Sequence, residues 1–530
     1  MKKIVKISLA VLSGLLLALA WPTKGIVFLI FIGFVPLLYL QDRIGDENDN
    51  VKGNIFWLSF IAFLVWNSLT TWWVWNSTAA GAVAMLLLNS SFMATTFWLY
   101  HFTRKKVFHN KNGYFLLLLF FLAFENLHLT WQLNWPWLNI GNVFSHNHSW
   151  VQWYEYTGVA GGTIWVLLVN ILAYKTLKSC LDEDGLSLKK NIIVFIVTLI
   201  VPLAISKIMY VSYEEKGEEV EVVVVQPNID PYKEEFVLSA ADILGRNFKE
   251  AEPVMTEKTR FVVSPESSIH ENIWLDKLEY YYSIKNLRLF SRNNNGAAYV
   301  IGASTLGMVP EGEEDDFAAR KFYDADEYYY SYNTAFLVTD TAEIQYHQKS
   351  RLTPGVEMMP SWWFLRPLKK LAIDLGGTVG TLKSEDETTL LTYGGHKIAP
   401  MICYESVFGG YVTEFVRDGA DMIFVITNDG WWGDTPGHRQ HFEMSKLRAI
   451  ENRRAIARSA NTGISGFINQ RGDVVEQTRY WEPAALRNDM KVNEEVTFYS
   501  QHGDYLYRIA SFVAVLILCF SIVTSVLRKK

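Results

Sequence analysis

The chain has 530 residues, of which 50% are hydrophobic, and its 49 Lys and Arg residues against 55 Asp and Glu residues give a net charge of −6. This length exceeds one ordinary domain, and the apolar content exceeds that of a wholly soluble protein. The acidic balance and the 15% aromatic content exclude a disordered chain and argue against a basic nucleic-acid-binding protein, so no nucleic-acid partner is expected.

Apolar stretches in two parts of the chain predict membrane spans. Seven fill the first 212 residues and an eighth closes the chain, and each approaches the roughly 20 apolar residues that cross a hydrocarbon core. We therefore predict a seven-helix membrane bundle over 1–212, a globular domain over 213–503 and a C-terminal transmembrane helix over 504–530. The predicted spans are about 4–21, 25–40, 55–75, 79–101, 113–128, 158–174, 192–211 and 506–527.

The positive charges of the short loops predict the orientation in the membrane. With the N-terminus inside and eight spans, three basic groups fall in the cytoplasm. The loop 129–157, which has no Lys or Arg, and the segment 213–503 then fall outside. The basic groups are Arg104, Lys105, Lys106 and Lys111; Lys175, Lys178, Lys189 and Lys190; and Arg528, Lys529 and Lys530.

The segment 213–503 has the pattern of a globular α/β domain. Apolar, β-branched runs of three to six residues are typical of buried strands, and a helical pattern over 438–458 lies after them. The basic side chains of that helical pattern are expected to pair with acids inside the domain. The predicted strands include 220–225, 261–263, 298–301, 335–338, 401–402 and 422–426.

The three cysteines are scattered, and the predicted topology separates them. Cys180 falls in a cytoplasmic loop, Cys519 in the last span and Cys403 in the external domain, so no disulfide is expected. Cys403 ends an apolar run and precedes a turn, where a thiol can be presented beside backbone N–H groups that hold an oxyanion. The alternative is a small buried hydrophobe, which is the commoner state of a single Cys.

Two further strand ends carry charges. Glu266 follows the apolar run 261–263, and Lys349 follows a strand and precedes Pro354-Gly355. A fold buries such charges only for use or by pairing. Taken singly, each of these residues is more often a solvated strand end or part of a salt bridge.

Taken together, the strings PESS, KSRLTPGVE and MICYES resemble the three catalytic blocks of the nitrilase superfamily. The resemblance implies an αββα sandwich for the external domain and a catalytic triad of Glu266, Lys349 and Cys403. A carboxylate can take the thiol proton and return it to a leaving group, the thiolate can form a thioester, and the ammonium can stabilise the oxyanion with the Tyr404 N–H as a second donor. This chemistry needs no metal and no cofactor.

The whole chain, with spans on both sides of such a domain, resembles the membrane-embedded apolipoprotein N-acyltransferase branch of that superfamily. The strings over 134–141 and 440–464 extend the similarity beyond the triad. The resemblance implies a bacterial inner-membrane, multi-pass protein with its catalytic domain on the periplasmic side. It also implies a phospholipid acyl donor, a thioester intermediate and a diacylglyceryl-modified lipoprotein acceptor in the bilayer.

Three further residues match family positions reported as important, and we assign supporting roles to Glu357, Tyr404 and Glu405. Glu357 positions Lys349 or Cys403, or forms a structural ion pair. The sequence departs from the usual family pattern in two places. The string TPGVE replaces a more usual VPFGE, and the loop after Asn228 offers Tyr232 and Phe236 where a Trp is common.

Two alternatives remain open. A membrane-tethered amidase would use the same triad, but eight spans exceed what an anchor requires. A non-catalytic lipid-binding sensor on this scaffold would not need an intact Glu, Lys and Cys. His438 and His441 share one helix face without a further ligand pattern, which argues against a zinc hydrolase. Glu125, His128 and the Trp-rich loop 129–157 lie at or near the membrane, where ionisable groups usually face a cavity or a partner.

Overall fold

The computed structural model describes residues 1–21, 23, 25–46, 54–359, 361, 381–385 and 387–527. The chain divides into two compact units. The helical unit comprises Met1–Trp75, Ala79–Tyr213 and Asp504–Lys530, and the α/β unit comprises Asn76–Thr78 and Glu214–Gly503. The predicted basic group Arg528, Lys529 and Lys530 lies outside the described residues.

The helical unit contains long apolar helices. Within the described residues, seven are long and apolar enough to cross a membrane, six of them before the α/β unit and one after it. The second predicted span is divided into the short 3₁₀ helix Val27–Phe31 and α2. The helices are α1 Lys3–Ala20, α2 Val35–Asp46, α3 Asn54–Thr71, α4 Ala79–Phe108, α5 Leu116–Thr130, α6 Tyr154–Leu181, α7 Gly185–Ser212 and α13 Tyr505–Leu527.

The fifth predicted span is shorter than the others. It forms α5, whose 15 residues extend about 22 Å at 1.5 Å per residue, less than the ~30 Å of a hydrocarbon core. Leu122 of α5 packs with Ala160 of α6 and with Tyr507 and Ala510 of α13. These contacts hold the short helix in the bundle through its apolar face.

One charge expected in a loop is buried instead. Arg104 lies within α4 with a fully buried side chain, and its Nη1 lies 2.5 Å from Oδ1 of Asp42 on α2. The hydroxyl groups of Tyr114 and Tyr174 each donate to Asp42 Oδ2 at 2.6 Å. Because a buried charge requires such partners, this cluster ties α2, α4 and α6 together at one end of the helical unit.

The ionisable groups of α5 have structural partners. Glu125 accepts hydrogen bonds from the N–H of Ile140 at 2.6 Å and from the Thr163 hydroxyl at 2.8 Å, which fastens the loop 129–157 to α5 and α6. The His128 ring is buried against the aromatic rings of Phe92, Phe124 and Trp131. Glu125 is therefore an anchor for the Trp-rich loop.

The α/β unit is built from two packed sheets. The larger has the strand order β14-β1-β2-β4-β6-β5, with β3 on β4 and β7 on β6, and the smaller has the order β13-β12-β11-β10-β9-β8. The strands are β1 Glu219–Gln226, β2 Phe261–Val263, β3 Ile269–Trp274, β4 Ala298–Met308, β5 Arg320–Lys321, β6 Tyr328–Val338, β7 Gln345–Gln348, β8 Leu391–Tyr393, β9 His396–Ile402, β10 Met422–Thr427, β11 Ile456–Ala460, β12 Gly466–Ile468, β13 Val474–Gln477 and β14 Ala484–Lys491.

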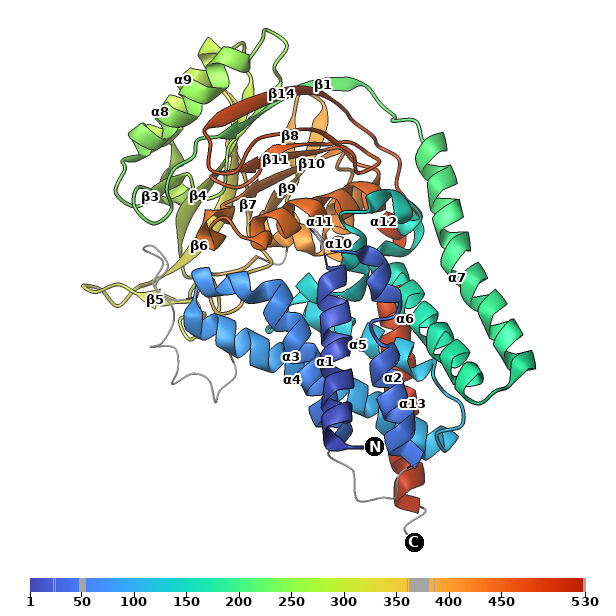
Figure 1. Cartoon of the computed structure of the whole chain (residues 1–530). Coiled ribbons are helices and arrows are strands. Elements are labelled where there is room, and N and C mark those ends of the chain that lie inside the picture. The colour runs from blue at the N-terminus through green and yellow to red at the C-terminus, as the bar shows by residue number, and fades with distance from the viewer. Residues whose placement is uncertain are drawn as a thin grey trace. The chain divides into compact units, whose positions relative to one another are not determined.

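The alternation of side chains along the strands explains the layers. On β1, Val222 and Val224 point into the core between the sheets, whereas Val223 and Val225 pack under α8 (Ala240–Ala251) and α9 (Tyr282–Asn293). Figure 1 shows α8 and α9 side by side on the larger sheet, with α10 (Gly409–Arg417) and α11 (Pro436–Asn452) beside the smaller one. The predicted αββα sandwich is confirmed.

The predicted helix over 438–458 was too long at its C-terminal end. Helix α11 ends at Asn452, because Arg453 adopts a left-handed conformation with φ of 49°. Arg458 therefore lies on β11 instead of the helix. The basic residues of this region do pair within the unit, as in Arg448 with Glu451 and Arg458 with Asp429.

Candidate active site

The three residues of the predicted triad follow the carboxyl ends of three strands. Glu266 comes after β2, Lys349 directly after β7, and Cys403 directly after β9. In sheets of this kind, ligands bind beyond the carboxyl ends of the strands. Gly302 on β4 allows the Glu266 turn to approach, because an added Cβ there would lie 2.6 Å from the Glu266 Cα.

Lys349 lies between two carboxylates. Its Nζ is 3.0 Å from Oε1 of Glu266 and 2.7 Å from Oε1 of Glu357, and all three side chains are almost wholly buried. Asn333 on β6 donates to the Glu266 Oε1 at 2.7 Å, and the backbone N–H of Asn428 donates to Oε2 at 3.1 Å. The structure thus brings Glu266, Lys349 and Glu357 into one hydrogen-bonded cluster.

Burial and mutual attraction decide the charges of this cluster. Burial acts to lower the pKa of Lys349, but the carboxylates of Glu266 and Glu357 outweigh it and hold that pKa well above its usual range. Burial raises the pKa of Glu266, and the opposing attraction of Lys349 does not cancel that effect. Lys349 is therefore a permanent cation, and Glu266 is a carboxylate prepared to accept a proton.

Cys403 occupies a strained turn at the start of a 3₁₀ helix, Cys403–Val407. Its φ is 52°, in the left-handed region that costs a non-glycine residue about 1–3 kcal/mol. The Ser406 hydroxyl donates to the Cys403 carbonyl at 2.7 Å and helps to hold the turn. Burial and the nearby Glu266 carboxylate raise the pKa of the Cys403 thiol well above its usual value, so the resting thiol keeps its proton.

Glu405 joins the Cys403 turn to the Lys349 strand end. Its fully buried carboxylate accepts from the N–H of Ile402 at 2.8 Å and from the N–H of Ser350 at 2.7 Å, and it lies 3.3 Å from Nε2 of His347. Burial opposes the charge, but His347 and these hydrogen bonds outweigh it and lower the pKa of Glu405. Glu405 thereby fixes the distance between the two strand ends.

Tyr404 is buried beside the thiol. Its side chain is 4% exposed and packs against the ring of Phe408, with ring centroids 5.1 Å apart. Burial and the adjacent Cys403 raise the pKa of the Tyr404 hydroxyl well above its usual value, so the phenol stays neutral.

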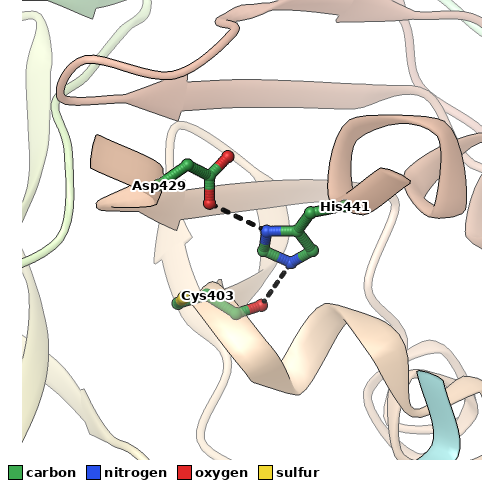
Figure 2. A group of neighbouring side chains, drawn as sticks. All are labelled: Cys403, Asp429 and His441. Atoms are coloured by element: carbon green, nitrogen blue, oxygen red, sulfur yellow. Dashed lines mark hydrogen bonds and ion pairs between the residues drawn. The ribbon is translucent and has the colours of Figure 1, made fainter. Parts of the chain in front are cut away.

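Cys403, Asp429 and His441 form a close group (Figure 2). His441 Nε2 lies 3.2 Å from the Cys403 carbonyl oxygen, and His441 Nδ1 lies 2.9 Å from Asp429 Oδ1. The Cys403 sulfur points away from the imidazole in Figure 2. His441 therefore contacts the backbone of the nucleophile and not its thiol.

This group resembles a metal site by residue type, but its charges do not fit one. The Arg458 guanidinium lies 2.6 Å from Asp429 Oδ2 and 3.0 Å from His441 Nδ1, so a cation already occupies the position beside both ligand atoms. Burial and Arg458 also lower the pKa of His441, which keeps the imidazole neutral. The group supports the turn from behind.

A cavity of about 160 Å³ opens over the cluster. This space holds several water molecules, so it has room for a reacting ester or amine group. Its walls include Glu266, Lys349, Glu357 and Cys403, together with Asn333, Asn428, Glu235 and His270.

Sequence reasoning did not identify several residues of this site, among them Asn333, Asn428, Asp429 and Glu235. Asn428 and Asp429 follow the apolar run 422–426 after Thr427, which is the kind of position that singled out Glu266, whereas Glu235 lies beside Glu234 in a loop and gave no such signal. His441 and Arg458 were interpreted as parts of one helix, and their convergence on Asp429 depends on the chain reversal after Asn452.

Family models match two parts of the chain. Residues 13–172 match the apolipoprotein N-acyltransferase N-terminal domain, and residues 287–492 match the carbon-nitrogen hydrolase family. The second match contains Lys349 and Cys403 and begins after Glu266. The fold and these matches define a membrane-embedded member of the nitrilase superfamily.

Relatives match nearly the whole chain. The apolipoprotein N-acyltransferase of Chlorobaculum tepidum is 27% identical over 96% of this chain and 94% of its own length, and that of Geobacter metallireducens is 27% identical over 94% and 91%. That of Thermotoga maritima is 25% identical over 97% and 93%. An amidase structure from Nesterenkonia sp. is 17% identical, covers 55% of this chain and 97% of its own, and has a TM-score of 0.35. The chain is thus similar over nearly its whole length to apolipoprotein N-acyltransferases, and it is an acyltransferase.

The hydrogen bond from Asn333 predicts a pH effect. It favours the ionised form of Glu266, so Asn333→Leu should raise the pKa of Glu266 further and move the acid limb of Cys403 reactivity to higher pH, by about one unit. The rate of Cys403 alkylation against pH, measured with Cys180 and Cys519 replaced by Ala, reports this limb. Asn294→Leu, on a residue whose side-chain amide donates to the Phe290 carbonyl, is the control. An unchanged limb would contradict the role of Asn333.

The contacts of Glu405 predict a pH-dependent stability. Glu405→Gln should lower the free energy of unfolding by about 2–3 kcal/mol at neutral pH, because charged hydrogen bonds across the two strand ends are lost. The pKa of Glu405 is lowered on folding, so its contribution is present above its ordinary pKa and is lost as pH falls through the lowered value. The difference in the free energy of unfolding between wild type and variant, measured by thermal unfolding, should therefore become smaller in acid. Glu476→Gln, on an exposed strand residue, should change the free energy of unfolding little. If the difference between wild type and Glu405→Gln grew larger in acid, the predicted direction of the pH effect would be wrong.

Proposed function

We propose that the chain moves a fatty acyl group from a membrane phospholipid, through a thioester on Cys403, to the α-amine of a diacylglyceryl-cysteine at a lipoprotein N-terminus. The cluster of Glu266, Lys349 and Cys403 at the strand ends, in a chain of this family, carries the proposal. The curated relatives are named apolipoprotein N-acyltransferases, which supports a lipoprotein as the acceptor.

In the first half of the proposed reaction, Glu266 takes the proton of the Cys403 thiol, and Sγ attacks the acyl carbon of the phospholipid ester. The negative charge on the carbonyl oxygen is stabilised by the Lys349 ammonium, with the Tyr404 N–H as second donor. The ester C–O bond then breaks, and Glu266 returns the proton to the departing oxygen. The products are an acyl-enzyme and a lysophospholipid.

In the second half, the amine nitrogen of the acceptor attacks the thioester carbon. A proton moves from nitrogen to Glu266, the C–S bond breaks, and the proton returns to Sγ. An amide forms and the thiol is restored. Because Glu266 acts as base and acid in both halves, its raised pKa suits both directions of transfer.

Glu357 and Glu405 have positioning roles in this scheme. Glu357 accepts a second hydrogen bond from the Lys349 ammonium at 2.7 Å, and its own carboxylate is fixed by the N–H of Thr353 at 2.8 Å. Glu405 keeps the Cys403 turn beside the Lys349 strand end. Neither carboxylate needs to touch the substrate.

The basic residues support an extracytoplasmic position for the α/β unit in a bacterial inner membrane. Lys175, Lys178, Lys189 and Lys190 fall in the cytoplasm only if α5 crosses the bilayer despite its length. If α5 did not cross, the α/β unit would lie in the cytoplasm. A short span is accommodated by local thinning of the bilayer at a modest cost.

Mass spectrometry of the intact, detergent-purified protein after incubation with phospholipid tests the chemistry. Wild type should gain one acyl mass that hydroxylamine removes and that moves to the amine of a diacylglyceryl-cysteine peptide. Glu266→Gln and Lys349→Met should slow acylation by about 10²–10⁴-fold, because each loses proton transfer or oxyanion stabilisation.

The other cysteines provide the control for this experiment. The double variant Cys180→Ala and Cys519→Ala should keep the adduct, whereas Cys403→Ala should lose it. If water hydrolyses the adduct at the same rate with and without the peptide, the result would favour the amidase alternative. A folded wild-type protein that gains no acyl mass would refute the thioester route.

Thiol labelling in whole cells tests the orientation. With Cys519 replaced by Ala, the exposed Cys180 should react with a membrane-impermeant reagent only after the inner membrane is permeabilised. A Cys introduced as Tyr323→Cys, at a fully exposed position of the α/β unit, should react without permeabilisation. The opposite pattern would mean that α5 does not cross the membrane.

A further inference from the structure

The cavity wall contains one more carboxylate, Glu235, which the scheme above does not use. Its side chain is 4% exposed and lines the same cavity as Cys403. Nδ2 of Asn428 donates to both carboxylate oxygens, at 2.8 and 3.0 Å, and Nε2 of His270 lies 3.3 Å from Oε1. A buried carboxylate with two donors on one side retains acceptor capacity on its other side.

Asn428 places Glu235 next to the general base. The backbone N–H of Asn428 donates to Glu266, while its side-chain amide donates to Glu235. Asn428, which directly follows β10, thus bridges the two carboxylates through its backbone and its side chain. A group bound at Glu235 is therefore held beside the carboxylate that exchanges protons with Cys403.

The charges of the cavity favour a cation at this position. Glu235, Glu266 and Glu357 contribute three carboxylates to its wall, against the single ammonium of Lys349. Such a surplus repels phosphate and attracts a positively charged group. The acyl donor brings a neutral ester to the thiol, whereas the acceptor brings an α-amine that is protonated in water at neutral pH.

Proton balance requires a further acceptor in the second half-reaction. An α-ammonium that becomes an amide loses two protons. One passes through Glu266 to the Cys403 sulfur, and Glu266 cannot carry the other at the same time. The second proton must leave before the nitrogen can attack, because an ammonium has no free electron pair.

We propose that Glu235 binds the α-ammonium of the acceptor in the cavity, takes its excess proton and passes it to His270. The His270 side chain is 19% exposed, which gives the proton a route to solvent, and its ring packs against Phe236 at 4.9 Å. The freed amine attacks the thioester, and the bound proton leaves as hydronium. This inference rests on the proposed function and names the acceptor subsite of the same cavity.

Measuring the two half-reactions separately distinguishes acceptor binding by Glu235 from a purely structural role. Glu235→Gln should leave acylation of Cys403 by phospholipid within about 3-fold of wild type, and should slow transfer to a diacylglyceryl-cysteine peptide by about 30-fold or more, with a raised KM for the peptide. Glu235→Asp, which keeps the charge, should restore part of the transfer rate. His270→Asn should slow transfer less than Glu235→Gln does.

Hydroxylamine provides a second measurement on the same acyl-enzyme. It is an uncharged nucleophile at neutral pH, so Glu235→Gln should not slow its attack on the thioester. A loss of both reactions to the same extent would overturn the proposal, because it would mean that Glu235 only holds Asn428 and the Glu266 base in place. An unchanged rate of peptide transfer would overturn it as well.

Glu234 offers a matched control in the neighbouring position. It is about one-third exposed, pairs with Arg246 at 2.9 Å and is not among the residues of the cavity wall, so Glu234→Gln should keep both half-reactions. A wild-type protein that forms no acyl-enzyme would refute the proposed function and this inference with it. A wild-type protein that acylates Cys403, together with a Glu235→Gln variant that still transfers normally, would refute the inference alone.

Discussion

The site depends on one interaction, the burial of the Lys349 ammonium between the carboxylates of Glu266 and Glu357. Removing three charges from water costs several kcal/mol per ion unless each is paired and hydrogen-bonded. The structure meets this demand with short contacts to both carboxylates and with donors from Asn333, Asn428 and Thr353. The chain segments that carry these donors are therefore held in place by the same charged cluster that they stabilise.

The cluster also fixes which groups are charged before a substrate arrives. Lys349 keeps its proton, so the oxyanion partner of the proposed reaction is present before the substrate binds and needs no reorganisation. Burial raises the pKa of both Glu266 and Cys403, so the thiolate is generated only when the proton can move between them. A thiol that loses its proton only during the reaction suits an enzyme that, as proposed, forms a thioester and protects it from water.

The sequence predicted the positions of the candidate site residues best where a reactive side chain follows directly on a strand. Glu266 and Cys403 come just after apolar runs and Lys349 comes just after a short strand, and these strand ends place all three at one edge of the sandwich. The predicted strands are confirmed, because mostly apolar runs such as 220–225 are removed from water when they are buried in a sheet.

The remaining residues depend on tertiary structure that no local pattern encodes. Asp429, His441 and Arg458 meet only because α11 ends at Asn452 and the chain returns as β11, a reversal set by one left-handed residue. Arg104 was assigned to a loop because it begins a run of basic residues, yet its guanidinium has a buried partner on α2. Glu235 gave no signal, since one acidic residue beside another in a loop is ordinarily solvated.

The protonated state of Cys403 has a consequence for the chemical lifetime of the protein. Oxidation to sulfenic acid proceeds through the thiolate, and it is fastest for exposed cysteines with a low pKa. Cys403 has the opposite properties, since it lies in a small cavity and burial keeps its proton in place. On the extracytoplasmic side proposed for this unit, where thiols are readily oxidised, the resting enzyme can keep a single reactive cysteine without a partner thiol to reduce it.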